Sequence, residues 1–125
     1  MKRTILVVDD SPIMRKIIPY LLRQAEVRFD SVLEAADGRE ALLLLRAHKV
    51  ALILCDISMP GMSGIELLSR LRQEGLAVGV PILMVTAESG DAQLRQAILY
   101  GARGYIRKPF SALHLRASLL PLLAA

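Results

Sequence analysis

Residues 50–56 read VALILCD, an apolar run that ends directly in an aspartate. Two other short runs, 5–8 (ILVV) and 82–85 (ILMV), are apolar throughout. Such runs are too short for typical helices, and they lack the alternation of apolar and polar residues that marks a strand with one exposed face. Strands buried on both faces of a parallel sheet have this composition. The three runs therefore predict the central strands of a parallel sheet, with 50–55 as the strand before Asp56.

The segments between these runs have helical character. Ser11 followed by Pro12 predicts a helix start, because serine caps helix N-termini and proline is tolerated in the first turn. Further helices are expected over 38–49, from the capping pattern of Ser63 and Glu66 onward, over 91–100 and over 111–123, and weaker strands over 31–35 and 103–106. Strand–helix alternation at this spacing predicts an α/β fold with helices on both faces of the sheet. Pro19, inside the first helix, should kink or weaken it.

The length and composition of the chain limit the classes of protein to which it can belong. With 125 residues, of which 54% are hydrophobic, the chain fits one compact domain spanning residues 1–125. No apolar run approaches the roughly 18 residues of a membrane span, and the apolar start at 5–8 is too short for an export signal. The single cysteine, Cys55, excludes an internal disulfide and is expected to be a buried, inert thiol. A reducing, cytoplasmic location is consistent with this.

Positive charge is distributed unevenly along the chain. No acidic residue follows Asp91, whereas five basic residues do: Arg95, Arg103, Arg107, Lys108 and Arg116. We therefore expect one end of the domain to carry a positive surface. Such a surface can be a solvated face, or it can dock an acidic partner or nucleic acid.

Polar residues follow four of the predicted strands. They are Asp9 and Asp10, Asp56, Thr86 and Lys108. Taken singly, residues of this kind are usually helix caps, loop residues or solvated side chains. In an open parallel sheet, however, ligands bind outside the carboxyl ends of the strands, so these side chains should converge on one edge. Clustered carboxylates need a cation such as Mg²⁺, and Lys108 and Thr86 could contact a phosphoryl group on Asp56.

Four segments carry a resemblance to a known family: 5–11 (ILVVDDS), 56–64 (DISMPGMSG), 85–87 (VTA) and 101–110 (GARGYIRKPF). Together they are similar to the receiver domains of bacterial two-component response regulators, over essentially the whole chain. The resemblance implies a five-stranded parallel sheet in the order 2-1-3-4-5 with helices on both faces. Residues 103–105 lack the acidic residue of the winged-helix transcription-factor subgroup, so the chain resembles the chemotaxis-type receivers more closely.

The resemblance implies that Asp56 accepts a phosphoryl group from a phosphohistidine on a sensor histidine kinase or a phosphotransfer protein. It implies that Asp10, Asp56 and the backbone carbonyl of Ser58 bind Mg²⁺ directly, with Mn²⁺ as a substitute. Asp9 would bind the same ion through water. Ser58 and Glu88 would occupy the positions that tune how fast the phosphoryl group is lost.

Other positions are implied to form a switch. The hydroxyl of Thr86 would move toward the phosphoryl group while the ring of Tyr105 turns inward. Lys108 would contact the phosphoryl oxygens, and the small Ala87 would leave the site accessible. The Lys108–Pro109 peptide bond is expected to be cis, an isomer common only before proline.

The resemblance further implies a cytoplasmic phosphoacceptor switch rather than an enzyme. Its output surface, on the last two helices and the last strand, would bind an output protein or an attached effector domain. The domain would be a monomer or a weak phosphorylation-dependent dimer, with no direct nucleic-acid contact and no membrane insertion. We hypothesise that the basic residues there dock an acidic partner, so charge reversal at Arg95 and Arg116 should weaken binding. A complete single-domain regulator is favoured over a receiver cut from a longer protein.

Other classes fit these residues less well. A flavodoxin-like nucleotide or flavin binder needs Gly, Ser or Thr after the first strand, where Asp9 and Asp10 would repel a phosphate. A phosphatase of the haloacid dehalogenase type needs an Asp-x-Asp pair, and Ser58 stands at its second position. The Gly-x₄-Gly-Lys of P-loop enzymes is missing. An interaction domain of the same fold that is never phosphorylated stays the main alternative, although the full set of site residues argues against it.

Overall fold

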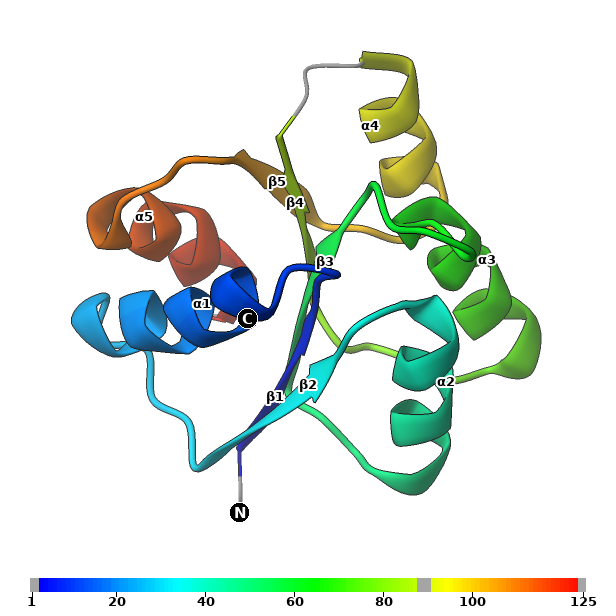
Figure 1. The fold of residues 1–125 in the computed structure, drawn as a ribbon, viewed down its shortest axis with the longest axis horizontal. Helices are drawn as coiled ribbons and strands as arrows, with labels where there is room; N and C mark the ends of the chain where they lie inside the picture. The colour runs from blue at the N-terminus through cyan, green and yellow to red at the C-terminus, as the bar shows by residue number, and fades with distance from the viewer. Residues whose placement is uncertain (1–2, 88–90, 124–125) are drawn as a thin grey trace.

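The structure is a computed structural model that describes residues 3–87 and 91–123, in which strands and helices alternate along the chain (Figure 1). The strands are β1 (Thr4–Val8), β2 (Ser31–Ala35), β3 (Leu52–Asp56), β4 (Ile82–Thr86) and β5 (Gly104–Arg107). The helices are α1 (Pro12–Gln24), α2 (Gly38–Ala47), α3 (Gly64–Glu74), α4 (Asp91–Leu99) and α5 (Ala112–Leu123). The predicted strand–helix alternation is confirmed. None of these described helices is both long and apolar enough to cross a membrane.

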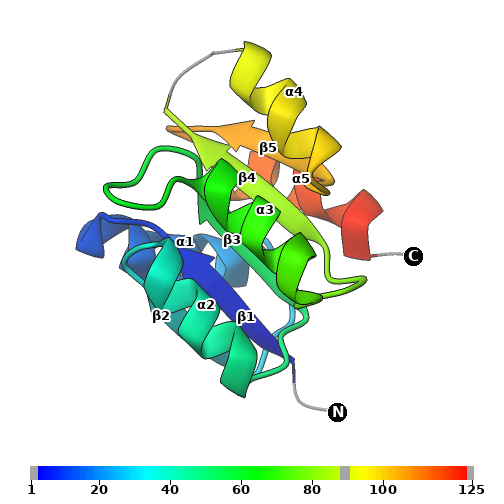
Figure 2. The same cartoon turned by 90° about the vertical axis from the view of Figure 1, so that its right-hand side faces the viewer.

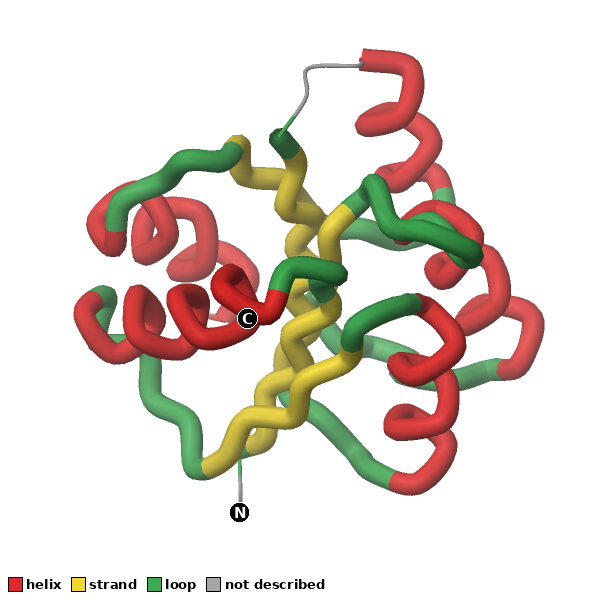
Figure 3. Tube along the Cα trace, viewed as in Figure 1, coloured by secondary structure: helices red, strands yellow, loops and turns green. Residues whose placement is uncertain are grey.

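The strands form one parallel sheet in the order β2-β1-β3-β4-β5, as the resemblance implied. β1 pairs with β2 on one side and with β3 on the other, so Val8 lies beside both Ala35 and Cys55. The strand order reverses between β1 and β3, which is the position where open α/β sheets bind ligands. The carboxyl ends of β1, β3, β4 and β5 lie at the same edge of the sheet (Figure 3). The topology thus brings four strand ends to one place.

Two layers of helices cover the sheet, α1 and α5 on one face and α2, α3 and α4 on the other (Figure 1, Figure 2). Successive strand residues point to opposite faces. Ile5 and Val7 therefore pack in the cluster with α1 and α5, whereas Leu6 and Val8 pack in the cluster with the other layer. Every residue of β3 and β4 is buried. Burial on both faces explains why the central strands are apolar throughout.

Side-chain caps set the start of α1 and of α3. The hydroxyl of Ser11 accepts a hydrogen bond from the backbone N–H of Met14 at 3.2 Å. The hydroxyl of Ser63 accepts one from the backbone N–H of Glu66, also at 3.2 Å. Each cap satisfies an N–H group that has no partner within the helix. The two predicted helix starts are confirmed.

Some boundaries differ from the sequence prediction. Asp56 and Thr86 are the last residues of β3 and β4 rather than the first residues after them, because both still pair with a neighbouring strand. β3 begins at Leu52 rather than at residue 50. Pro19 lies buried inside α1, and the helix continues past it to Gln24. Pro19 therefore does not interrupt α1.

Candidate functional site

Four strand ends deliver polar side chains to one edge of the sheet. Asp9 follows β1, Asp56 ends β3, Thr86 ends β4 and Lys108 follows β5. Backbone hydrogen bonds hold the two residues that lie beyond their strands: the N–H of Asp9 donates to the carbonyl of Ala35 at 3.0 Å, and that of Lys108 donates to the carbonyl of Thr86 at 2.8 Å. The convergence predicted from the sequence is present in the structure.

Three carboxylates form a cluster at this edge. One oxygen from each of Asp9, Asp10 and Asp56 lies within 4.8 Å of the other two. Asp9 is 1% and Asp56 is 6% exposed, whereas Asp10 is exposed to solvent. Ionised carboxylates at this separation repel one another, and an all-oxygen donor set with one open side suits a hard divalent cation that keeps some of its water. The residues present therefore fit a metal site.

Lys108 supplies positive charge to the same cluster. Its Nζ donates to Oδ2 of Asp9 at 2.9 Å and forms an ion pair with Oδ2 of Asp56 at 3.4 Å. Burial by itself would lower the pKa of Lys108, but the two carboxylates outweigh burial and raise the pKa. Burial also raises the pKa of Asp56, although the nearby lysine acts in the opposite direction. The ammonium group of Lys108 therefore stays charged, and it lies beside the largely buried carboxylate of Asp56.

Backbone groups orient the two buried carboxylates. Oδ1 of Asp9 accepts a hydrogen bond from the N–H of Ser11 at 2.9 Å. Oδ1 of Asp56 accepts one from the N–H of Ser58 at 3.2 Å. With Oδ2 of each residue directed toward Lys108, both carboxylates have one oxygen fixed by the backbone and one by the ammonium. This arrangement positions the carboxylates before any ligand binds.

Sequence reasoning missed two groups that support the site. The guanidinium of Arg15 donates to the backbone carbonyl of Asp9 at 2.8 Å and to Oε1 of Glu34 at 3.1 Å, tying α1 and β2 to the end of β1. Gly64, the first residue of α3, packs so closely that a Cβ there would overlap the backbone carbonyl of Asp56. The sequence signal for the close packing of Gly64 was a glycine directly after the Ser63 cap. No spacing pattern in the sequence predicted the contacts of Arg15.

The predicted switch residues lie around this cluster. Thr86 is buried, and Ala87 beside it is exposed. Tyr105 is 43% exposed on β5, and its predicted inward movement stays a prediction. Ser58 is exposed beside Asp56. Glu88 lies outside the described residues.

The Lys108–Pro109 peptide bond is cis, as predicted. Cys55 is buried in β3, and burial raises the pKa of its thiol. Both facts agree with the sequence interpretation. The thiol of Cys55 donates a hydrogen bond to the backbone carbonyl of Asp56 at 3.3 Å.

The basic residues of the last third of the chain do not gather at one end. Arg103 precedes β5 and Arg107 ends it, so they lie at opposite edges of the sheet. Arg95 is exposed on α4, and Arg116 on α5 lies 3.7 Å from Glu26. The expected single positive end is therefore wrong, because residues close in sequence are separated by the length of a strand.

The family model for the response regulator receiver domain matches residues 5–120. This chain belongs to the response regulator receiver family. The chemotaxis protein CheY-3 of Vibrio cholerae is 41% identical over 115 residues, which cover 92% of this chain and 87% of that protein. The chemotaxis protein CheY of Pseudomonas aeruginosa is 43% identical over 108 residues, covering 86% of each.

Solved structures agree with this assignment. The chemotaxis response regulator CheY4 of Vibrio cholerae matches with a TM-score of 0.85 and 32% identity, covering 98% of this chain and all of that one. A putative response regulator from Chloroflexus aurantiacus matches with a TM-score of 0.86 and 32% identity, covering both chains completely. The protein is a chemotaxis-type, CheY-like receiver domain of two-component phosphorelay signalling. Kinases or phosphotransfer proteins and effectors are the partners of such domains.

Proposed function

We propose that the protein is a Mg²⁺-dependent phosphoacceptor switch in which Asp56 accepts a phosphoryl group from a phosphohistidine. The donor would be a sensor histidine kinase or a phosphotransfer protein. The observation that carries the proposal is the buried carboxylate of Asp56, held 3.4 Å from the ammonium of Lys108 and beside the carboxylates of Asp9 and Asp10. A carboxylate nucleophile between cationic groups is the arrangement that phosphoryl transfer to aspartate requires.

In this transfer, an oxygen of Asp56 bonds to phosphorus as the phosphorus–nitrogen bond of the donor breaks, and the electron pair stays on the histidine nitrogen. The product is an acyl phosphate on Asp56. Lys108, already directed at Asp56 Oδ2, would offset the charge on the phosphoryl oxygens. Asp10, Asp56 and the carbonyl of Ser58, with Asp9 through water, would hold the Mg²⁺, or Mn²⁺ in its place. When bound, the ion supplies further positive charge to the same oxygens.

The switch would follow from the position of Thr86 at the end of β4. Its hydroxyl would donate a hydrogen bond to the phosphoryl group, and Tyr105 would leave its exposed position as Thr86 moves. Phosphorylation would thereby shift an existing equilibrium of the face formed by α4, β5 and α5. Ala87 would leave room for the donor, and Ser58 with Glu88 would set how fast the phosphoryl group is lost.

The output of the switch would be binding to a protein partner or to an attached effector domain, in the cytoplasm, without direct nucleic-acid contact. The domain would act as a monomer or a weak phosphorylation-dependent dimer, and it would turn over no substrate as an enzyme does. Family membership supports these assignments. A phosphorylation-independent interaction domain of the same fold is the alternative.

Incubation with acetyl phosphate and Mg²⁺, followed by intact-mass measurement, tests the proposal. The wild type should gain the mass of one phosphoryl group. Asp56→Asn, which keeps the size of the side chain but removes the nucleophile, should gain none, and excess chelator should suppress the gain in the wild type. An unmodified wild type would favour the interaction-only alternative. A gain that persists in Asp56→Asn would place the acceptor elsewhere.

A further inference from the structure

Arginines gather at the edge of the sheet opposite Asp56. Arg3 precedes β1, Arg28 lies between α1 and β2, and Arg103 precedes β5. All three are exposed and line one recess at the amino ends of the strands. They come from segments far apart in the chain. We call the set Arg3, Arg28 and Arg103 the amino-edge arginines.

The recess has an apolar floor. Ile5, Val27, Leu52 and Leu122 line it together with the amino-edge arginines, and no acidic residue is among its described lining residues. Its volume is about 210 Å³, smaller than the roughly 300–1,000 Å³ of pockets that enclose whole small-molecule ligands. A space of this size suits one or two apolar side chains rather than a complete cofactor.

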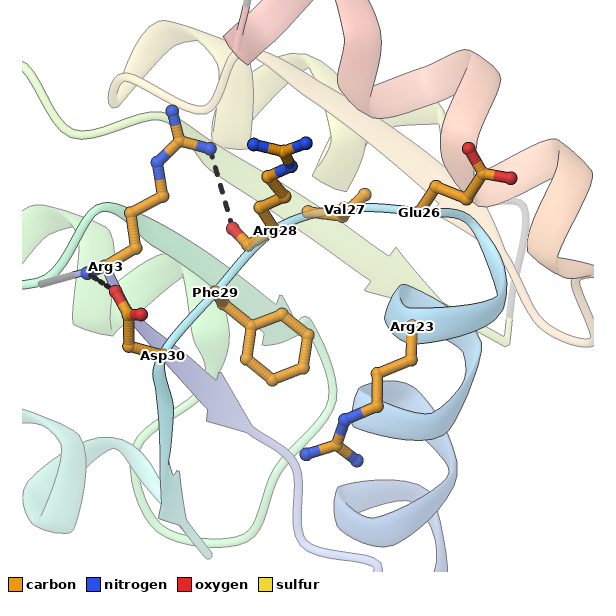
Figure 4. A pocket seen from close by; sticks show the side chains of 7 residues that line it. All are labelled: Arg3, Arg23, Glu26, Val27, Arg28, Phe29 and Asp30. Carbon is orange, nitrogen blue, oxygen red and sulfur yellow. Dashed lines mark hydrogen bonds between the residues drawn. The ribbon is translucent and has the colours of Figure 1, made fainter.

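A wider, more open recess adjoins the first and shares Arg3, Val27 and Arg28 with it. Figure 4 shows the side chains that line it, with the guanidinium groups of Arg3 and Arg28 on the same side of the loop between α1 and β2. Arg23 lies over the ring of Phe29, 5.1 Å from its centroid. The two recesses together form a basic channel that leads to an apolar floor.

The carboxylates nearby do not neutralise these arginines. Asp30 accepts a hydrogen bond from the backbone N–H of Arg3 rather than from its guanidinium. Glu26 lies 3.7 Å from Arg116 on α5. The guanidinium of Arg3 donates to the backbone carbonyl of Arg28 at 3.5 Å. Within residues 3–87 and 91–123, none of the amino-edge arginines forms an ion pair with a carboxylate.

We propose that the amino edge docks an acidic peptide segment of a partner protein, with an apolar side chain of that segment in the recess. Carboxylates of the segment would pair with the amino-edge arginines, because the planar guanidinium matches a carboxylate in two-point hydrogen bonding. The apolar side chain would pack against Val27, Pro81 and Leu122, which line the recess and are half-buried. Since these apolar residues are recessed rather than protruding, the edge fits a peptide better than an anionic membrane surface.

Docking at the amino edge is independent of the proposed phosphoryl transfer. The arginines and Asp56 lie at opposite ends of the strands, so binding needs neither Mg²⁺ nor a phosphoryl group. Occupation of one edge leaves the other edge open. The amino edge would therefore act as a constitutive tether rather than as an output of the switch.

Fluorescence anisotropy with the full chain tests this proposal. The probe is a fluorescein-labelled peptide of alternating Glu and Leu, measured at low and at high salt. Reversing the charge at Arg3 and Arg28 together (Arg3→Glu, Arg28→Glu) should weaken binding at low salt at least about tenfold, since each attractive pair becomes a repulsive one. Arg28→Glu alone should weaken it less. Arg39→Glu, which reverses the charge of an exposed arginine on α2 away from the recess, is the matched control and should bind like the wild type.

Two further probes test the nature of the ligand. A peptide with Gln in place of Glu should lose the salt dependence, and one with Ser in place of Leu should bind more weakly because the recess stays empty. Equal loss in Arg39→Glu, or no binding by the wild type, would overturn the proposal. So would cosedimentation with phosphatidylglycerol vesicles that depends on Arg3 and Arg28 in the absence of peptide binding, because it would identify a membrane as the ligand. A midpoint of urea denaturation like that of the wild type confirms that the double variant is folded.

Discussion

The two edges of the sheet carry opposite charge and are built in different ways. At the carboxyl edge, Asp9, Asp10 and Asp56 form a cluster of carboxylates. The two buried members, Asp9 and Asp56, each have a backbone partner and the ammonium of Lys108 as a partner. At the amino edge, Arg3, Arg28 and Arg103 line an open recess without a carboxylate partner among the described residues. The side chains of the first edge are pre-oriented by hydrogen bonds and ion pairs, whereas the arginines of the second are exposed to solvent.

This difference follows from where each group sits relative to its strand. Each of the residues Asp9, Asp56, Thr86 and Lys108 ends a strand or directly follows one, so hydrogen bonds of the sheet hold their backbones. Arg3 and Arg28 lie in exposed segments outside the strands. The site residues are thus held by the sheet itself, whereas the amino-edge arginines extend from residues beside it. Four predictions probe this contrast, in order of decreasing effect.

Replacing Gly64 by alanine should have the largest effect. The new Cβ would overlap the carbonyl of Asp56 and come within 3.0 Å of the Cα of Ile57, both of which are backbone atoms that cannot turn aside. We expect the free energy of unfolding to fall by at least about 3 kcal/mol, measured by urea denaturation. Gly104→Ala is the control, since its Cβ meets only a side-chain atom of Leu83 at 3.4 Å. A similar loss in both variants would mean that the carboxyl edge is not specially close-packed.

Mg²⁺ should stabilise the protein through the carboxyl edge alone. At ten times its dissociation constant, a cation that binds only the folded state adds about 1.4 kcal/mol to the free energy of unfolding. Thermal unfolding with and without the ion measures the gain. Asp10→Asn should abolish most of it, because Asp10 is one of the clustered carboxylates. Arg28→Glu should keep it in full. A gain that survives in Asp10→Asn would place the ion elsewhere.

Glu34→Gln should lower stability by about 0.5–1 kcal/mol at neutral pH, since Glu34 pairs with Lys16 at 2.7 Å and with Arg15 at 3.1 Å. Hydrogen bonding from Lys16, followed by the contributions of Arg15, lowers the pKa of Glu34. A lowered pKa stabilises the fold above the unfolded-state pKa of roughly 4.3. This contribution is lost as the pH falls through the folded-state pKa.

Urea denaturation of the wild type and of Glu34→Gln across this pH range checks the prediction. The difference between the two proteins should disappear in acid. Glu26→Gln is the control, because Glu26 is 77% exposed and 3.7 Å from its partner, and it should show little effect at any pH. A constant difference for Glu34→Gln would mean that packing rather than charge accounts for the loss.

Arg28→Glu should have the smallest effect on stability, within about 0.5 kcal/mol of the wild type, because the residue is exposed and outside the strands. The same variant should weaken binding of the acidic peptide. Urea denaturation and anisotropy on one preparation separate the two effects. A loss of stability comparable to that of Gly64→Ala would show that the amino edge is structural and not a docking surface.

Much of the carboxyl edge could be predicted from the sequence. The apolar runs indicated which segments form central strands, and parallel strands place their carboxyl ends together, so Asp9, Asp56, Thr86 and Lys108 were expected to meet. Hydropathy could not set the last residue of a strand. Asp56 and Thr86 are polar but still pair within the sheet, because backbone pairing does not depend on side-chain polarity.

The sequence by itself therefore determined the fold class and the chemical groups at the end of each central strand, since both depend on local patterns repeated along the chain. Only the tertiary structure decided which charged residues, far apart in the sequence, lie close together. It brings Arg3, Arg28 and Arg103 to one recess, separates Arg103 from Arg107, and joins Arg15 to the carbonyl of Asp9. These neighbours depend on the strand order and on where side chains outside the strands extend, and the hydropathy pattern of the sequence records neither.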